Sequence, residues 1–268
     1  MFMGVQGEKP SAEPPEGSLQ LPQLIVNNHI LFFDKKASSS GNIKPPMARE
    51  LLNYYTSDQL RSHFLALGLG IRSVGFRPKP LNPAAGEKEA DPVLKEGNLL
   101  SNIFNRAVRS CFYTAQKYCD GKIPIGYVSE EVLDKSKITI IEFENAMFRH
   151  EFHLAMDIIG KYIRDINKYW SDNMRITEDV FNDNVHRQTL IDSFHMVRVA
   201  TVLMHPIAPV GTEKILEYLG LGREFWSWDK IFEPIYVFMD NPEKHMLKYL
   251  EPRIDFFEKH SSQIQAYK

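Results

Sequence analysis

The chain has 268 residues, of which 43% are hydrophobic and 25% are charged, and its formal net charge is −2. This composition is typical of a globular protein, and the near-neutral charge excludes a uniformly basic nucleic-acid binder, so any RNA contact needs a local basic face. Two cysteines, Cys111 and Cys119, are too few for a disulfide scaffold and favour a reducing compartment. Because no apolar run approaches the about 18 residues of a membrane span and no signal-peptide pattern is present, we expect a cytoplasmic protein without a membrane partner.

The first part of the chain predicts an irregular segment followed by a strand and a loop. Four prolines exclude a helix over residues 5–23, whereas the branched and aromatic run Leu24–Phe33 predicts a buried strand. The loop after this strand is either a phosphate-binding loop or an ordinary solvated one, since ammonium groups, hydroxyls and glycine amides can all donate to an anion. Its candidate donors are Lys35, Lys36, Ser38, Ser40 and Gly41.

Two short helices and a proline-rich linker come next. Pro45 and Pro46 fit the first turn of a helix over Met47–Tyr55, and a second helix is expected to begin at residues 56–58 and to stop at Gly68. Four prolines then interrupt the pattern over residues 71–93, and we place a domain boundary between Asn82 and Pro92.

The rest of the chain is predicted to be almost entirely helical. A first helix is expected from about Val93 to Tyr118, and a long apolar stripe with gaps of three and four runs from Phe148 to Tyr169. Further helices are expected over Leu190–Met204 and over Thr212–Leu219, the last closed by Gly220. Helices with one apolar stripe must bury it against each other. The predicted fold is therefore mainly α, with a helical bundle over residues 91–268 preceded by a small α/β part over residues 1–90.

Four stretches of the sequence, taken together, point to a known family. Lys36–Asn42 resembles a degenerate Lys-Met-Ser-Lys-Ser loop followed by Gly-Asn, and Ser57–Leu65 resembles a stem-contact helix. Asn98–Ala107 is similar to the opening helix of an anticodon-binding bundle, and Leu250–Asp255 is similar to a closing Leu-Phe-Pro-Arg-Ile element. These features, in this order, resemble the C-terminal part of methionyl-tRNA synthetases, which are class I aminoacyl-tRNA synthetases.

The resemblance implies a part of a ligase that attaches methionine to tRNA at the expense of ATP. Residues 1–90 would be the C-terminal edge of the catalytic domain, and residues 91–268 the anticodon-binding domain. The His-x-Gly-His motif of the family's first half does not occur in this sequence, so we expect a separate catalytic domain as a partner and no activity from this chain alone. The alternative is a catalytically inactive module, derived from the same family, that binds tRNA or a protein.

The resemblance also implies an ATP contact at the loop. Lys36, Ser38 and Ser40 would be its catalytic residues, and Lys35, Lys36 and Gly41 would face the phosphates of ATP. Ser39 stands where the family has its second lysine, and a hydroxyl cannot supply a full charge to the transferring phosphates. Catalysis by this loop is therefore expected to be weakened.

For tRNA, the family implies an Asn and an Arg four residues apart on one face of the first bundle helix. Two frames fit this spacing, Asn102 with Arg106 and Asn105 with Arg109, and the sequence leaves both open. The family's stacking tryptophan is replaced by Ile176, which offers no large π face, so anticodon discrimination is expected to be poor. No metal site is predicted, because the spacing of His150 and His153 is not a zinc motif and no third ligand accompanies them.

Overall fold

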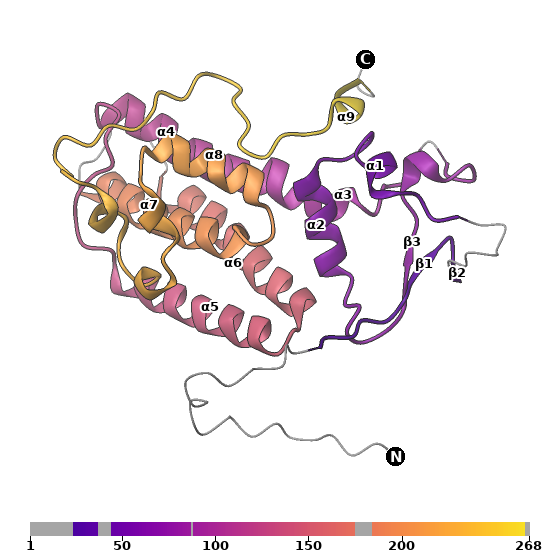
Figure 1. Ribbon diagram of the computed structural model, residues 1–268. Helices are drawn as coiled ribbons and strands as arrows, with labels where there is room; N and C mark the ends of the chain where they lie inside the picture. The colour runs from indigo at the N-terminus through magenta and orange to yellow at the C-terminus, as the bar shows by residue number, and fades with distance from the viewer. Residues whose placement is uncertain (1–23, 37–43, 87, 175–183, 266–268) are drawn as a thin grey trace, which may run out of the picture.

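The computed structural model describes residues 24–36, 44–86, 88–174 and 184–265. A small part, with a sheet and short helices, lies beside a larger helical bundle (Figure 1). Each part has its own hydrophobic core, and Val93, at the start of the bundle, completes the core of the small part. The predicted fold class is confirmed.

The small part contains a three-stranded sheet in the order β2-β1-β3, formed by Ile30–Phe32 (β1), Lys35–Lys36 (β2) and Val74–Phe76 (β3). Strand β1 is antiparallel to β2 and parallel to β3. The strand predicted over Leu24–Phe33 is therefore much shorter than expected, and Leu24 is 86% exposed. The cause lies at Asn28, whose backbone amide and side-chain amide both donate to the carbonyl of Leu69, so that the preceding segment follows this loop and not the sheet.

Two helices pack against the sheet, α1 (Ala48–Leu51) and α2 (Ser57–Ala66). Thr56 and Gln59 begin α2 with reciprocal hydrogen bonds between side chain and backbone, as in a capping box. The helix predicted over Met47–Tyr55 keeps only one turn. The helix ends there because Tyr55 is buried in the small core and its hydroxyl donates a hydrogen bond of 2.6 Å to the Oδ2 atom of Asp91.

The bundle begins with one continuous helical stretch, as predicted. It comprises α3 (Leu94–Asn98), a π-helical segment (Leu99–Phe104) and α4 (Asn105–Tyr118). The remaining bundle helices are α5 (Glu130–Phe148), α6 (Phe152–Asn173), α7 (Val185–Met204) and α8 (Pro209–Leu219). Helix α7 is central, since its residues from Thr189 to Met204 are all buried.

The apolar stripe predicted from Phe148 into a single helix was wrong at its start. Phe148 ends α5 and is 75% exposed, and the chain turns at His150, which has a φ of 59°, before α6 begins. Helix α5 itself was not predicted. The predicted end of α8 is confirmed at Gly220, whose φ of 68° is readily adopted by glycine.

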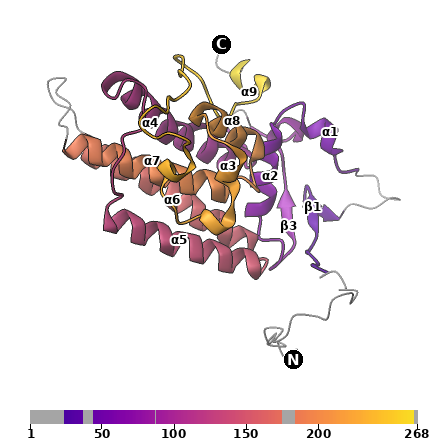
Figure 2. The ribbon, with the colours of Figure 1, turned by 60° about the vertical axis from the view of Figure 1, so that its left-hand side comes forward.

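After α8 the chain caps one end of the bundle through three short 3₁₀ turns, Arg223–Trp226, Trp228–Lys230 and Ile235–Phe238. Arg198 of α7 is fully buried beneath them and donates to the carbonyls of Ile231 and Lys230 at 2.7 and 2.6 Å. The chain then crosses the bundle along α4 and reaches the small part at α9 (Ser261–Gln265) (Figures 1 and 2). None of the helices described here combines the length and the apolar character that crossing a membrane requires.

Candidate nucleic-acid interface

The two lysines of the predicted phosphate loop lie on strand β2. Phe33 and Asp34 form the tight turn between β1 and β2 with φ values of 47° and 63°, a geometry typical of two-residue hairpins. Asp34 forms an ion pair with Arg77, next to β3, so its charge is balanced by that arginine. Lys35 and Lys36 are exposed and pair with no acidic side chain among the described residues. Ser38, Ser40 and Gly41 lie outside the described residues.

The two possible frames of the first bundle helix occupy different environments. In one frame, Asn102 is half-buried and donates to the Oδ1 atom of Asn98 at 3.0 Å, and Arg106 is exposed one turn later. In the other frame, Asn105 has no exposed surface and Arg109 forms an ion pair of 2.7 Å with Asp255. Only the Asn102 and Arg106 frame therefore presents its charge to solvent without a competing carboxylate among the described residues.

Asn105 holds the C-terminal segment against the bundle. Its Oδ1 atom accepts hydrogen bonds from the amides of Phe256 and Phe257, and its Nδ2 atom donates to the carbonyls of Phe257 and Ser101. The ring of Phe257 stacks on that of Phe104 with centroids 5.4 Å apart. Every hydrogen-bonding group of the Asn105 side chain is thus used within the chain, which is a structural role.

Asn167 and Tyr169 of α6 likewise make internal contacts. Asn167 donates to the carbonyl of Ile103 at 2.9 Å, and the hydroxyl of Tyr169 donates to Asp192 at 2.7 Å. Burial raises the pKa of Tyr169 above its ordinary value, and the hydrogen bond to Asp192 raises it further, so the hydroxyl remains a donor. Ile176, which replaces the family's tryptophan, lies outside the described residues.

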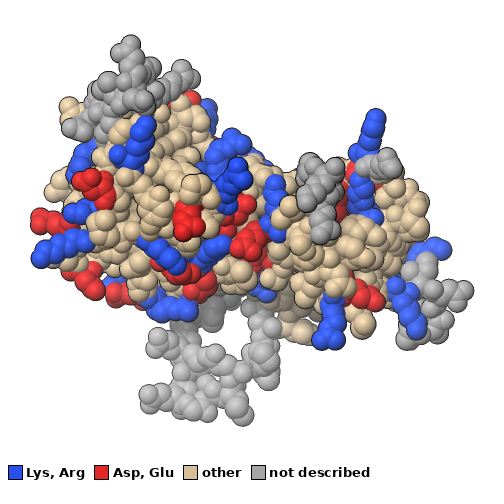
Figure 3. Space-filling view, turned by 90° about the horizontal axis from the view of Figure 1, so that it is seen from above, with Lys and Arg blue, Asp and Glu red and all other residues tan. Residues whose placement is uncertain are grey.

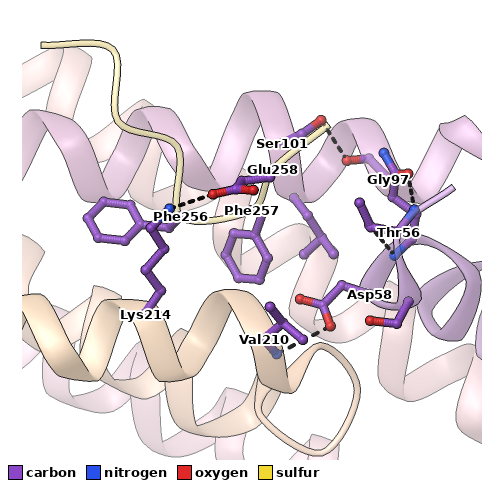
Figure 4. A pocket seen from close by; sticks show the side chains of 12 residues that line it. Thr56, Asp58, Gly97, Ser101, Val210, Lys214, Phe256, Phe257 and Glu258 are labelled. Carbon is purple, nitrogen blue, oxygen red and sulfur yellow. Dashed lines mark hydrogen bonds and ion pairs between the residues drawn. The ribbon is translucent and has the colours of Figure 1, made fainter. Parts of the chain in front are cut away.

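The start of α2 joins the small part to the bundle (Figure 4). The carboxylate of Asp58 accepts hydrogen bonds from the amides of Gly211 and Val210 at 2.8 and 3.3 Å, and so satisfies free donors in the first turn of α8. Arg61 donates to the carbonyls of Ile207 and Pro206 at 2.9 and 2.7 Å. Two residues of the stem-contact pattern thus clamp the turn that leads into α8.

Close approaches around this junction depend on two glycines. A side chain at Gly211 would meet the ring of Phe257 at 2.1 Å, and one at Gly97 would meet Gln59 at 3.0 Å.

Burial raises the pKa of Asp58 above its usual range, while the two amide hydrogen bonds and then Arg61 oppose the rise. The sequence indicated a helix start at Asp58 but gave no sign of its partner, because the contact joins residues about 150 positions apart.

Basic side chains gather on the small part. Residues 24–86 contain eight Lys and Arg against three Asp and Glu, although the whole chain has a net charge of −2. Figure 3 shows this uneven distribution, with blue predominating over the small part and both colours interspersed over the bundle. Sequence reasoning placed the RNA contact on the first bundle helix and missed this basic surface, which a charge count over the proposed domains would have found.

No family model matches the chain. Sequence comparison finds methionine–tRNA ligases of Halalkalibacterium halodurans, 28% identical over 226 residues, and of Bacillus subtilis, 28% identical over 223 residues. A methionine–tRNA ligase of Alkaliphilus oremlandii is 24% identical over 213 residues. These matches cover 79–80% of this chain. The chain is related to the methionyl-tRNA synthetases.

Relative to the methionyl-tRNA synthetases, the chain is short. It spans 32–37% of the length of the three curated relatives named above. Among solved structures, the Mycobacterium tuberculosis methionyl-tRNA synthetase bound by methionyl-adenylate has the same fold, with a TM-score of 0.66 and 22% identity over 85% of this chain and 43% of that one. The free form of that enzyme matches with a TM-score of 0.61 and 20% identity, over 78% of this chain and 40% of that one.

Proposed function

We propose that this chain is the tRNA-binding C-terminal part of a methionine–tRNA ligase and acts together with a separate catalytic domain. The observation that carries the proposal is the pair Asn102 and Arg106, which lies at the solvent-facing side of the first bundle helix in a chain related to methionyl-tRNA synthetases. An amide and a guanidinium one turn apart can hydrogen-bond the base edges of an unstacked RNA loop. The Asn105 and Arg109 frame instead stabilises the C-terminal segment.

The same proposal assigns Lys35 and Lys36 to the phosphates of ATP. Both ammonium groups are exposed beside a hairpin whose acidic residue, Asp34, is already paired with Arg77, so a charged ligand would meet two cations. Lysines of this kind fit the electrostatic part of phosphoryl chemistry, in which a well-placed donor is worth about 3 kcal/mol. Lys36, with Ser38 and Ser40, would support catalysis only when a catalytic domain supplies the rest of the ATP and methionine site.

The test of tRNA recognition is a competition experiment. A labelled methionine tRNA transcript should bind the purified chain, and an unlabelled transcript with a changed anticodon should compete with nearly equal strength, because Ile176 offers no stacking surface. Replacement of Arg106 by Ala should weaken binding of both transcripts. An intact chain that prefers one anticodon by a hundredfold would contradict the expected poor discrimination, and absence of binding to either transcript would remove the tRNA role.

The test of catalysis is ATP–pyrophosphate exchange with methionine. The chain alone should give no exchange, because residues that would hold adenine and methionine are not supplied by the hairpin. Exchange above background by the pure chain would show that this expectation is wrong.

The alternative is a catalytically inactive module that binds tRNA or a protein, and one feature favours a protein partner. The pair β1 and β3 is parallel, and parallel strands in proteins are covered on both faces. Here the outer edge of β3 pairs with no other described strand, and Ile30 and Ile71 are 38% and 69% exposed. A catalytic domain that extends this sheet, or another protein that does so, would cover these residues.

Methionine-dependent exchange on mixing the chain with a synthetase catalytic domain would distinguish the ligase from the inactive module.

A further inference from the structure

A groove of about 610 Å³ lies where the small part, the first bundle helix and the C-terminal segment meet. Tyr54 and Lys79 line it from the small part, Asn98 from α3, and Lys259 and Gln263 from the C-terminal segment. The Nε2 atom of Gln263 donates to the carbonyl of Tyr54 at 3.0 Å and so fixes the C-terminal wall to the small part. The groove is therefore assembled from three segments that are far apart in the sequence.

The charge of this groove is positive. Lys79 and Lys259 line it, and the Nζ atom of Lys79 donates to the carbonyl of Glu89 at 2.6 Å, whereas Asp91 is the one acidic residue among the lining residues. Both oxygens of Asp91 already accept hydrogen bonds, from the hydroxyl of Tyr55 at 2.6 Å and from the amide of Val93 at 3.0 Å. Lys259 pairs with no acidic side chain among the described residues. An anion in the groove would therefore meet the ammonium group of Lys259 and a carboxylate that is already engaged.

The groove is continuous with the proposed tRNA-binding face. Asn98 lines the groove, and its Oδ1 atom accepts the hydrogen bond from Asn102. Asn98, Asn102 and Arg106 follow one another at intervals of four residues, so a polar row leads from the groove along the helix. Tyr54 and Lys79 line the groove from the small part, which carries the excess of basic residues.

We propose that this groove binds the phosphodiester backbone of the tRNA, as a second contact beside Asn102 and Arg106; the inference rests on the proposed tRNA-binding function. Lys259 would neutralise a phosphate, the amide of Asn98 would donate to a phosphate or ribose oxygen, and the ring of Tyr54 would pack against a ribose or base. Contacts to phosphates position an RNA and carry no base sequence. The groove therefore contributes affinity, while the Asn102 and Arg106 pair faces the bases.

A free nucleotide offers the same phosphate chemistry, and the two sources make different predictions. An RNA strand that occupies the groove continues along the polar row, so the effect of Lys259 depends on the length of the RNA. A nucleotide in the groove would not reach along the polar row, so its binding there would be weakened by Lys259→Glu and insensitive to Arg106→Ala.

The experiment measures the affinity of a methionine tRNA transcript, and separately of ATP, for the intact chain and three variants. Lys259→Glu reverses the charge in the groove, Arg106→Ala alters the helix face, and Lys137→Glu is the matched control on α5, where Lys137 is exposed and does not line the groove. Circular dichroism confirms that each variant is folded. We expect Lys259→Glu to weaken tRNA binding about tenfold and to lower the logarithmic salt slope by about 0.7–0.9 per lost phosphate contact, with Lys137→Glu near the wild-type value.

Each other outcome has a defined meaning. If Arg106→Ala weakens tRNA binding while Lys259→Glu and Lys137→Glu bind equally, the groove is not an RNA contact but the proposed function stands. If Lys259→Glu abolishes binding of ATP and leaves tRNA binding unchanged, the groove is a nucleotide site and the inference is overturned. If the wild-type chain binds no tRNA at low salt, both the proposed function and this inference fail.

Discussion

The Oδ2 atom of Asp58 in α2 accepts a hydrogen bond of 2.8 Å from the backbone amide of Gly211 in α8. This contact joins the small part to the bundle across 153 positions of the chain, and Arg61 reinforces it one turn later by donating to the carbonyls of Ile207 and Pro206. The two residues act on one turn, so they should be energetically coupled. Asp58 and Arg61 of the stem-contact pattern thus stabilise the folded chain in the absence of RNA.

Replacement of Asp58 by Ala should destabilise the folded chain by about 1–2 kcal/mol, because it leaves two amides of α8 without their acceptor. Arg61→Ala should also destabilise it, and the double variant should lose less than the sum, with a coupling energy of about 0.5–3 kcal/mol. Urea denaturation of the four proteins measures this cycle, with Asp134→Ala on the exposed side of α5 as the control. Strict additivity would show that the two residues do not hold the same turn.

Asn105 and Asn102 lie on the same helix and should differ sharply in their effect on stability. Asn105→Ala removes the partner of two buried amides and should cost about 2–4 kcal/mol, whereas Asn102→Ala should stay within about 0.5 kcal/mol of wild type. In the first variant, residues 250–265 should also become accessible to proteases. Equal stabilities of the two variants would contradict the structural role of Asn105.

Two buried histidines should make folding sensitive to acid. Burial lowers the pKa of His63 and of His195 to about 4, with Lys95 and Arg198 respectively adding to the effect. Because the unfolded chain binds these protons from its ordinary value of 6.5 downward, their contribution to stability is present above pH 6.5 and is lost as the pH falls towards 4. The loss is about 1.4 kcal/mol per pH unit for each histidine.

His63→Gln and His195→Gln should therefore each reduce the fall in stability between pH 6.5 and 4. Urea denaturation at a series of pH values measures this slope. His29→Gln, at an exposed position, is the control. A wild-type protein with constant stability over this range would show that neither histidine is held neutral by the fold.

The linker between the two parts should be the first site of limited proteolysis. Lys88 is exposed between Asn82 and Pro92, where the domain boundary was predicted, so trypsin should cut there before it cuts the bundle. The fragments should nevertheless remain together in gel filtration, because α2 is tied to α8 by Asp58 and Arg61. A first cut inside α5–α8, or immediate separation of the fragments, would argue against this arrangement.

Local patterns predicted the helical half of the chain well. The stripes of α6 and α7, the Gly220 stop and the continuous first helix all follow from spacing within one element, and spacing is visible in a sequence. Helix α5 was not predicted because its solvent-facing side carries Ile138 and Ile141, which are 58% and 49% exposed. These two residues reduce the difference in hydrophobicity between its two faces.

Contacts between distant segments could not be predicted in the same way. Asn105 carries the residue type and spacing of an RNA-reading position, yet it bonds to Phe256 and Phe257, and nothing near it in the sequence indicates this. The groove at Lys259 also depends on where the C-terminal segment ends its path over the bundle. The shortened strand β1 has the same origin, since the contact of Asn28 with Leu69 outweighs the strand preference of its neighbours.

The central claim is that the first bundle helix binds tRNA through Asn102 and Arg106, and the salt dependence of tRNA affinity tests it most directly. Dissociation constants for a methionine tRNA transcript, measured at a series of salt concentrations for wild type, Arg106→Ala and the control Lys137→Glu, give the number of neutralised phosphates and the loss at each position. We expect wild type and control to share one slope, and Arg106→Ala to bind about tenfold more weakly through a lost base or phosphate contact. Binding by Arg106→Ala with the affinity and slope of wild type would contradict the account.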